Sequence, residues 1–263
     1  MSRLQDAFKK RKAFIPFVTA GDPTIEVTKK VILKMAEAGA DIIEIGIPFS
    51  DPSAEGPTIQ AASERALANH INVDDIFLMV QELRKELDIP LVFMTYINPI
   101  FVYGVDKFMS RCQEVGVDGL IIPDVPFEEK GLVADSCKKF QVEHISMIAP
   151  SSKERITMIA KQAEGFLYVV SSLGVTGVRK DIQTNVSDIL NKIRAVSPIP
   201  CAVGFGISTP EQAKTMARNA DGVIVGSAIV NIIAEKGEQA PEYVYQYVKK
   251  MTDTVHQELS TSV

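Results

Sequence analysis

Short apolar segments alternate with helical segments along the whole chain, and this alternation restricts the fold more than any other feature. Eight apolar segments have the length of strands, and they lie at 13–18, 42–47, 91–96, 119–122, 144–148, 165–170, 200–206 and 222–225. Between them, apolar residues recur at the spacing of amphipathic helices. Because neighbouring parallel strands need a crossover, usually a helix, the alternation predicts a parallel sheet. Eight strand–helix units in 263 residues match a closed (β/α)8 barrel, the TIM barrel.

Predicted helices extend beyond the eight units at both ends of the chain. Residues 2–11 are predicted to form a short amphipathic helix, and a last helix begins at Pro241. The length alone would also allow two smaller domains. Since the sequence contains no linker, low-complexity stretch or second domain, we predict one α/β domain over residues 1–263. It is a TIM barrel with extra N-terminal and C-terminal helices.

Three of the predicted strands follow a similar short sequence. A small residue and an aspartate precede the apolar run in GADIIEIGIPFSD, GVDGLIIPDVPFE and NADGVIVGSAIV. We interpret this similarity as one helix-to-strand turn that is used repeatedly, rather than as recent duplication.

Composition excludes several kinds of partner. The net charge of -5 and the pI near 5.4 argue against nucleic acid as the main partner. No apolar run is long enough for a transmembrane helix, and the N-terminus lacks the apolar core of a signal peptide. Cys112, Cys137 and Cys201 lack the spacing of metal ligands, so we expect buried thiols in a reducing compartment. We therefore expect a cytoplasmic protein without nucleic-acid or membrane partners.

One acidic residue interrupts the second apolar segment. Glu44 lies among Ile42, Ile43 and Ile45, in a run that is typical of a strand buried on both faces. An ionised carboxylate at such a position is costly unless it is paired, neutralised or functional. Two interpretations stay open from this stretch alone, a structural acid paired with an Arg or Lys, and a catalytic acid–base.

Active sites of TIM barrels lie at the C-terminal ends of the strands, so the side chains predicted there are the candidates. The candidates are Phe17, Thr19, Glu44, Ser50, Asp51, Glu55, Thr95, Tyr96, Asn98, Asp124, Tyr168, Ser171 and Ser172. The loops after the last three strands carry glycines instead, at Gly174–Gly177, Gly204–Gly206 and Gly226–Ser227. Glycine lets backbone N–H groups approach an anion, and a helix N-terminus adds positive partial charge. These loops predict a phosphate site.

Several other chemistries are disfavoured. No Lys follows any predicted strand, which argues against a Schiff-base aldolase. His70 and His256 fall in predicted helices and His144 at the start of a strand, without metal-ligand spacing. Acid–base chemistry by carboxylates on a phosphorylated substrate is what remains. The predicted pocket is partly apolar and aromatic, with Phe17, Ile59, Tyr96 and Tyr168.

Several motifs together resemble the α subunit of tryptophan synthase. They are PFVTAGDP (16–23), EIGIPFSDPSAEGPTIQ (44–60), PDVPFEE (123–129), SSLGVTGVR (171–179), GFGIS (204–208) and GSAIV (226–230). The resemblance runs in order from about residue 5 to 257. It implies a lyase of L-tryptophan biosynthesis that cleaves indole-3-glycerol phosphate to indole and glyceraldehyde 3-phosphate. It also implies no cofactor in this chain, a β-subunit partner in an αββα heterotetramer, and passage of indole between subunits through a tunnel.

The resemblance implies two catalytic residues. Glu44 matches the general acid–base, which takes the proton of the glycerol hydroxyl and delivers one to indole C3. The family has Asp in a DPxADGP motif, where its carboxylate stabilises the cation at the indole N–H; here the motif reads DPSAEGP, and the residue is Glu55. The added methylene displaces the carboxylate by about 1 Å, enough to cost of order a hundredfold in rate unless the loop compensates.

The same matching assigns the other site residues. Phosphate would be held by Gly177, Gly206, Gly226 and Ser227. The indole pocket would be lined by Phe17, Ile59, Tyr96 and Tyr168. Thr176 would close over the site and contact the loop from Asp51 to Glu55, and Asp124 would join that network.

The departure at Glu55 leaves other functions open. One is a weakly catalytic or non-catalytic regulatory α subunit that activates the β subunit. Another is a stand-alone lyase that releases free indole.

Overall fold

The strands of this protein form one parallel sheet that closes into a barrel. The computed structural model describes residues 2–150, 153–170, 179–204 and 206–258. The strands are β1 Ala13–Thr19, β2 Ile43–Gly46, β3 Leu91–Met94, β4 Gly119–Ile121, β5 Glu143–His144, β6 Ser146–Ile148, β7 Leu167–Val170, β8 Cys201–Gly204 and β9 Gly222–Val225. Their order in the sheet is β5-β4-β3-β2-β1-β9-β8-β7-β6.

The two ends of that order belong to one short segment of chain. β5 and β6 are separated only by Ile145, whose N–H donates to the carbonyl of Leu120 at 2.9 Å. The segment pairs with β4 through β5 and with β7 through β6. The sheet therefore closes on itself, which confirms the predicted barrel. The predicted fifth strand is present but is divided at Ile145 into β5 and β6.

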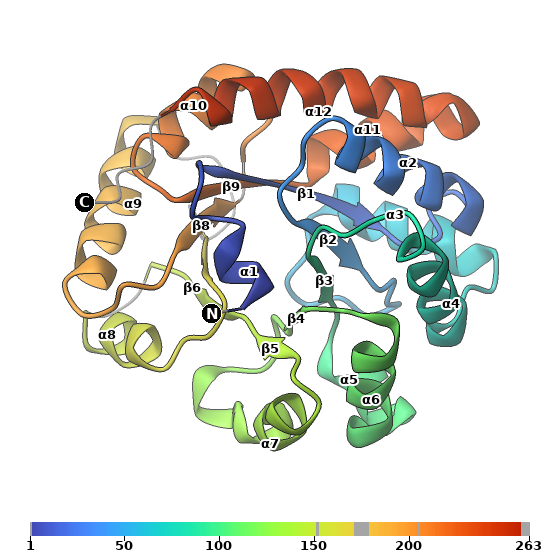
Figure 1. Cartoon of the computed structure of the whole chain (residues 1–263), viewed down its shortest axis with the longest axis horizontal. Coiled ribbons are helices and arrows are strands. Elements are labelled where there is room, and N and C mark those ends of the chain that lie inside the picture. Colours follow the sequence, from blue (N-terminus) through green and yellow to red (C-terminus); the bar gives the residue numbers. More distant parts are fainter. Residues whose placement is uncertain (1, 151–152, 171–178, 205, 259–263) are drawn as a thin grey trace.

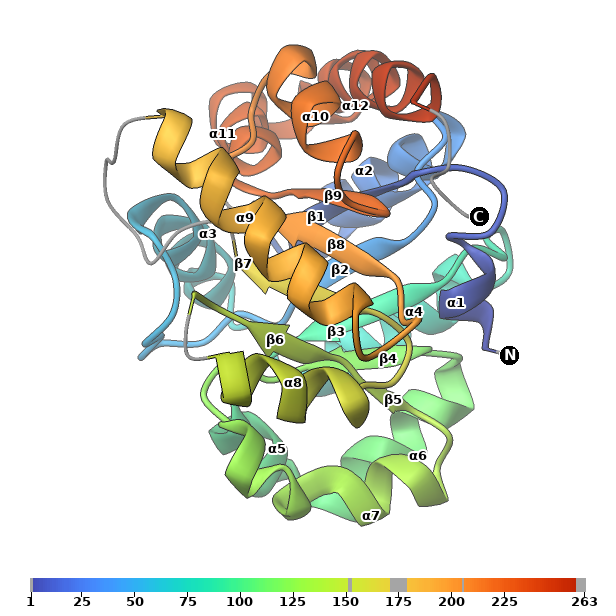
Figure 2. The ribbon, with the colours of Figure 1, turned by 90° about the vertical axis from the view of Figure 1, so that its left-hand side faces the viewer.

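Helices surround the sheet (Figures 1 and 2). They are α1 Arg3–Asp6, α2 Ile25–Glu37, α3 Pro57–Ala68, α4 Val73–Leu83, α5 Ile97–Tyr103, α6 Val105–Val115, α7 Gly131–Lys139, α8 Lys153–Lys161, α9 Arg179–Arg194, α10 Pro210–Ala217, α11 Ser227–Lys236 and α12 Ala240–His256, with short 3₁₀ turns Phe127–Glu129 and Gly237–Gln239. None of the helices in the described ranges is long and apolar enough to cross a membrane.

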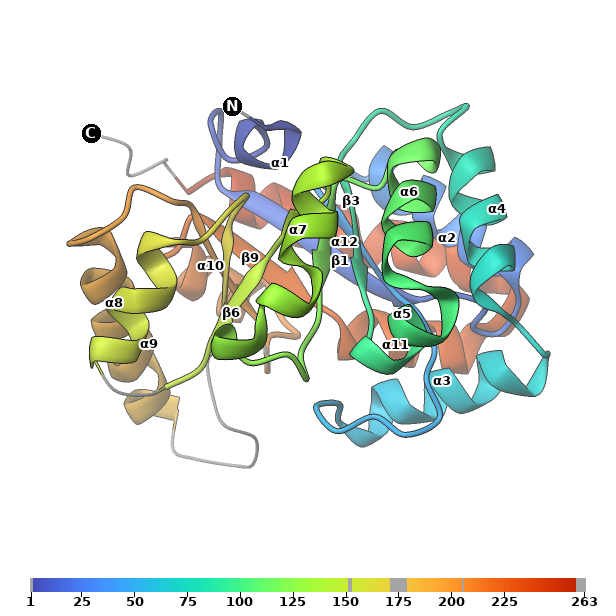
Figure 3. The ribbon, with the colours of Figure 1, turned by 90° about the horizontal axis from the view of Figure 1, so that it is seen from below.

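Helix α1 lies at one end of the barrel, opposite the end where α3 begins (Figure 3). Leu4 of α1 and Phe8 just after it are buried with inward-facing strand residues such as Ile15 and Ile121. These two side chains fill the end of the barrel at which the strands begin, and they leave the other end for a site.

Aspartates at the helix-to-strand turns connect neighbouring strands. Asp41 accepts a hydrogen bond from the Phe14 N–H at 2.8 Å, and Asp118 accepts one from Leu91 at 2.9 Å. Asp221 accepts one from Cys201 at 2.9 Å. Each carboxylate therefore satisfies a backbone donor at the start of the adjacent strand, which accounts for the repeated sequence pattern without any duplication.

Two local expectations were wrong, and one helix was not expected. The helix predicted for residues 2–11 ends at Asp6, because the chain must turn there to bury Phe8 under the barrel. The structure adds α5 before α6, with Gly104 between them at a φ of +93°. His70 follows the end of α3 in a turn with a φ of +57°, not in a helix. The three cysteines are free and buried, as predicted.

Candidate active site

Glu44 is held inside the barrel by the alternation of β2. Its neighbours Ile43 and Ile45 point outward to the helix layer, so Glu44 points inward, with only 1% of its surface exposed. Burial raises the pKa of the Glu44 carboxyl to about 8. Within the described part of the chain, its Oε2 has no hydrogen-bond partner and no Arg or Lys pairs with it. The interpretation as a structurally paired acid is therefore not supported.

Tyr168 lies close to this carboxyl. It faces inward from β7, and the pKa of its hydroxyl is raised by burial and by the negative charge of Glu44. A Cβ atom at Gly204 would come within 2.5 Å of the Tyr168 hydroxyl oxygen. Glycine at that position of β8 thus makes the room that the tyrosine needs, since β7 and β8 are paired neighbours.

An apolar wall begins next to Glu44. Phe17 of β1 is the register partner of Glu44 and is buried against Ala62 of α3 and Val230 of α11. Ile59 and Met94 pack against the same cluster. The structure therefore brings together three predicted residues, Phe17, Glu44 and Tyr168, with Ile59 at the edge of the same wall.

A second carboxyl group follows on the loop after β2. Glu55 is half-buried, which raises the pKa of its carboxyl, while a hydrogen bond from Tyr96 lowers it. Its Oε2 is buried and lacks a hydrogen-bond partner among the described residues. Gln60 Nε2 donates to the Glu55 carbonyl at 2.8 Å and fixes the backbone. Strand β2 and the loop after it thus place two carboxyl groups in different environments. This arrangement suits separate roles, one in proton transfer and one in electrostatic stabilisation.

Asp124 has a structural partner. Its carboxylate accepts from the N–H of Ile97 at 3.0 and 3.3 Å, at the first turn of α5. An acidic side chain there stabilises the helix N-terminus. The residue also lines a cavity of about 400 Å³ beside β4 and β6, together with Ile122, Met147 and Val170.

The predicted phosphate loops are described in part. Gly206 follows β8 with a φ of +73°, and a Cβ there would meet no atom within 4 Å. Gly226 precedes α11, whose first residue is Ser227, and no side chain caps this helix. Because β8 and β9 are paired, these two loops lie at neighbouring strand ends. Thr176 and Gly177 lie outside the described residues.

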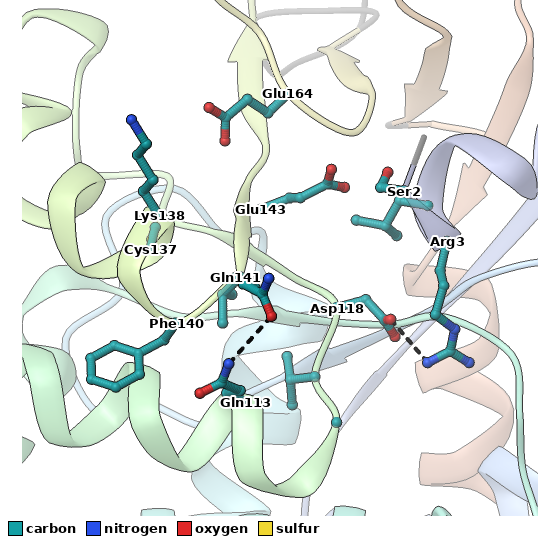
Figure 4. Close-up of a pocket in the computed structure, with 14 residues that line it drawn as sticks. Ser2, Arg3, Gln113, Asp118, Cys137, Lys138, Phe140, Gln141, Glu143 and Glu164 are labelled. Atoms are coloured by element: carbon teal, nitrogen blue, oxygen red, sulfur yellow. Dashed lines mark hydrogen bonds and ion pairs between the residues drawn. The ribbon is translucent and has the colours of Figure 1, made fainter.

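A further pocket of about 400 Å³ lies at the opposite end of the barrel (Figure 4). Two pairs of its polar side chains bond to each other, Arg3 with Asp118 at 3.0 Å and Gln113 with Gln141 at 3.5 Å. The Oε2 of Glu143 is buried without a partner among the described residues. This pocket and the cavity beside Asp124 have the same volume, so volume does not show which of them is the active site. Position does, because the N-terminal face of a TIM barrel serves stability and the C-terminal face serves catalysis.

Comparison with known proteins decides the family. A family model described as tryptophan synthase alpha chain matches residues 4–259. The tryptophan synthase alpha chain of Lacticaseibacillus casei is 46% identical over 263 residues, which cover 100% of this chain and 99% of that one. That of Thermoanaerobacter sp. (strain X514) is 48% identical over 95% of this chain and 94% of its own. The chain belongs to the tryptophan synthase alpha chain family.

Solved structures of the tryptophan synthase alpha chain family agree with the barrel. A crystal structure of the tryptophan synthase alpha chain from Legionella pneumophila has a TM-score of 0.87 at 38% identity, covering 97% of each chain. A tryptophan synthase complex from Pyrococcus furiosus has a TM-score of 0.84 at 35% identity, covering 93% of this chain and 99% of that one. The family and the fold expected from sequence are confirmed, while the roles of individual residues stay predictions.

The structure adds two residues to this family's predicted site. Met94 ends β3 and packs against Phe17, and Phe49 lies with its ring centroid 5.2 Å from that of Tyr96. Met94 follows the inward-facing Val92 at the two-residue period of a strand, so the sequence carried a signal for it. Phe49 lies in a loop without such a period.

Proposed function

We propose that this chain is a cofactor-independent carbon–carbon lyase, the α subunit of tryptophan synthase in the cytoplasm. It cleaves indole-3-glycerol phosphate to indole and glyceraldehyde 3-phosphate in L-tryptophan biosynthesis. The observation that carries this proposal is Glu44, a buried carboxyl beside an apolar wall, whose Oε2 has no hydrogen-bond partner among the described residues. With a pKa of about 8, this group is mostly protonated near neutral pH and can both give and accept a proton there.

Glu44 serves both proton transfers. Neutral Glu44 delivers its proton to indole C3, and the resulting positive charge spreads to the ring N–H. The Glu44 carboxylate then takes the proton of the adjacent glycerol hydroxyl. The bond between C3 and the hydroxyl-bearing carbon breaks, its electron pair returns to the ring, and that carbon becomes the aldehyde. Glu44 ends protonated, so the proton count balances.

The other residues bind and stabilise. Glu55 accepts from the ring N–H and stabilises the charge that develops there. The indole pocket is lined by Phe17, Ile59, Tyr96 and Tyr168. Backbone N–H groups hold the phosphate, at Gly177, Gly206, Gly226 and Ser227. Thr176 closes over the site.

We further propose a β-subunit partner in an αββα assembly. A solved relative from Pyrococcus furiosus is described as a tryptophan synthase complex. On this chain, Phe101 and Val102 are adjacent residues of α5 with 48% and 81% of their surfaces exposed. Exposed apolar pairs of this kind suit a protein partner, and α5 starts directly after Tyr96 of the site.

The experiment is steady-state cleavage of indole-3-glycerol phosphate by the purified chain, with and without a β subunit. Release of indole in both cases, faster with the β subunit, is expected. The longer side chain at Glu55 favours one alternative, a regulatory α subunit with little turnover. Stimulation of a β subunit without measurable cleavage would support that alternative and contradict the lyase.

A further inference from the structure

We propose that Tyr247 of the C-terminal helix α12 is a positioning residue that holds the loop after β8 in the conformation that binds phosphate. The proposal rests on the proposed function, because it takes Gly206 of this loop as part of the phosphate site. Tyr247 is not assigned to the phosphate itself. It acts through the backbone of Ser208, two residues after Gly206.

Gly206 is the point of this loop with the least conformational restraint. It follows β8, whose last residue, Gly204, pairs with Val170 of β7. Gly206 has a φ of +73°, and a Cβ placed on it would meet no atom within 4 Å. Glycine in open space has more backbone freedom than any other residue. Its N–H group can therefore serve a phosphate only if contacts elsewhere in the loop hold it in place.

The two residues after Gly206 supply contacts of this kind. The side chain of Ile207 is buried in the cluster that packs in the helix layer, and the half-buried Tyr247 packs against the same cluster. The Tyr247 hydroxyl donates a hydrogen bond to the carbonyl of Ser208 at 2.9 Å. The loop is therefore tied to α12 by a backbone hydrogen bond and by packing in a shared cluster.

The start of α10 holds Ser208 from its other side. Gln212 Oε1 accepts from the N–H groups of Ser208 at 2.8 Å and of Thr209 at 3.1 Å. The Thr209 hydroxyl accepts in turn from the Gln212 N–H at 3.3 Å, which completes a capping box. The capping box thus binds the N–H of Ser208 and Tyr247 binds its carbonyl, so that neither contact replaces the other.

Helix α12 connects the two halves of the proposed phosphate site. It packs against α10, which follows the Gly206 loop, and against α11, which begins at Ser227 (Figure 1). Its buried face includes Val244, Val248 and Met251. Because this face fixes the helix on the core, the Tyr247 hydroxyl gives the loop a fixed reference point.

Phenylalanine at position 247 isolates the hydrogen bond. It keeps the ring that packs against the core and lacks only the hydroxyl donor. Burial raises the pKa of the Tyr247 hydroxyl to about 12, so in wild type the hydroxyl keeps its proton near neutral pH and can donate it to the carbonyl.

The test is calorimetric binding of glycerol 3-phosphate to the full chain, together with steady-state cleavage of indole-3-glycerol phosphate. Without the hydrogen bond the loop leaves its binding conformation for part of the time, which weakens binding by that fraction. The net strength of a typical hydrogen bond predicts a dissociation constant about threefold to tenfold higher in Tyr247→Phe. KM should rise by a similar factor with kcat changed less than about twofold, because the phosphate is bound in both the ground state and the transition state.

Tyr243→Phe is the matched control. Tyr243 lies one turn earlier on α12 and is 44% exposed, so loss of its hydroxyl should leave affinity and KM unchanged. A wild-type chain that does not bind glycerol 3-phosphate overturns the proposed phosphate site and this proposal with it. A wild type that binds, with equal affinity and KM in Tyr247→Phe, overturns this proposal alone. A lower melting temperature of Tyr247→Phe at unchanged affinity shows a purely structural role and also overturns it.

Amide hydrogen exchange gives a readout that needs neither ligand nor turnover. In Tyr247→Phe the N–H groups of Ile207 and Ser208 should exchange about threefold to tenfold faster than in wild type, because the loop opens more often. Tyr243→Phe should match wild type. Equal exchange of these two N–H groups in all three chains would show that Tyr247 does not hold the loop.

Discussion

At the scale of single residues, the chemistry of this chain depends on the contrast between two carboxyl groups. Glu44 is enclosed by the barrel, where burial alone raises its pKa to about 8. Glu55 lies on a loop, where burial and the Tyr96 hydrogen bond act on its pKa in opposite directions. The first environment favours exchange of protons near neutral pH, while in the second environment burial raises the pKa of Glu55 and the hydrogen bond opposes that shift. The two can therefore take different steps of one reaction.

Glu44→Gln should abolish cleavage without unfolding the chain. Glutamine keeps the size and polarity of the side chain but cannot transfer a proton, so kcat should fall by about a hundredfold to ten-thousandfold. Binding of a glycerol-phosphate analogue should stay within about twofold, because the phosphate loops lie on other strands. Steady-state kinetics and calorimetric binding measure the two effects. Retention of more than a few per cent of activity would show that Glu44 is not the acid–base.

Glu44 should also make stability depend on pH. Its carboxyl has a pKa of about 8 when folded against 4.5 for the ordinary group, so the folded state holds a proton that the unfolded state releases. The stability that this proton provides is fully present below pH 4.5 and is lost as the pH rises to 8. At pH 7 the loss is about 3 kcal/mol. Urea unfolding between pH 5 and 8 should show this slope in wild type; an equal slope in Glu44→Gln would rule Glu44 out as its source.

At the scale of elements, the positions of helices around the barrel mouth create binding groups that no single residue provides. Helix α11 begins at Ser227 without a capping side chain, and Gly206 adds an open backbone next to it. Such N–H groups bind anions without a cationic side chain. The phosphate site therefore belongs to the arrangement of β8, β9 and α11.

Gly206→Asp should weaken phosphate binding while the chain stays folded. A Cβ at this position meets no neighbouring atom, and aspartate tolerates the positive φ better than most residues. The added charge would repel the phosphate, so the affinity for glycerol 3-phosphate should drop about tenfold or more. Gly206→Asn is the matched control, with the same shape and no charge. If both variants bind equally, the phosphate does not lie at this loop.

Some elements were predictable from the sequence because their cause is local. Burial on both faces gives the strands their unbroken apolar runs, and the alternation with helices follows from parallel pairing. Helix α5 was missed because Asn98 and Pro99 indicate a loop, yet a proline is tolerated in the first turn, where its missing N–H would have no partner. The interruption at Ile145 has no turn or breaker signal in the sequence EHISMI, residues 143–148. It arises where one segment must pair with both edges of the sheet.

In the candidate site, too, some features were predictable from the sequence and others were not. Glu44 was predictable because an ionised carboxylate is costly in a buried apolar strand and therefore indicates a special role. The hydrogen bond from the Ala54 N–H to the Tyr96 hydroxyl, at 3.1 Å, was not predictable, because it joins residues that are distant in sequence and meet only in the folded chain. The family matches this chain from residue 4 to 259, but a family match does not say how a substituted residue is accommodated. That information lies in the contacts of the folded chain.

At the scale of the whole molecule, helix α5 presents an exposed apolar pair close in the chain to the predicted indole pocket. Phe101 and Val102 follow Tyr96 by one to two helical turns, so a partner docked on them would cover the chain next to the indole pocket. Because α5 begins directly after Tyr96, a partner docked on this helix would act on the chain beside that pocket. We therefore expect docking and catalysis to be linked through this helix.

Val102→Asp should weaken binding of the β subunit and leave the basal cleavage rate unchanged. Val102 is 81% exposed, so the change costs little folding energy, but a carboxylate buried at an interface is unfavourable by several kcal/mol. The dissociation constant should rise at least about a hundredfold, which is about 2.7 kcal/mol. Tyr243→Asp is the control: Tyr243 is 44% exposed on α12, on the other side of the barrel from α5 (Figure 1). For both variants, sedimentation with purified β subunit measures the dissociation constant, and steady-state kinetics measure how far the β subunit stimulates cleavage. Equal weakening by the two changes, or none by Val102→Asp, would place the partner on another face.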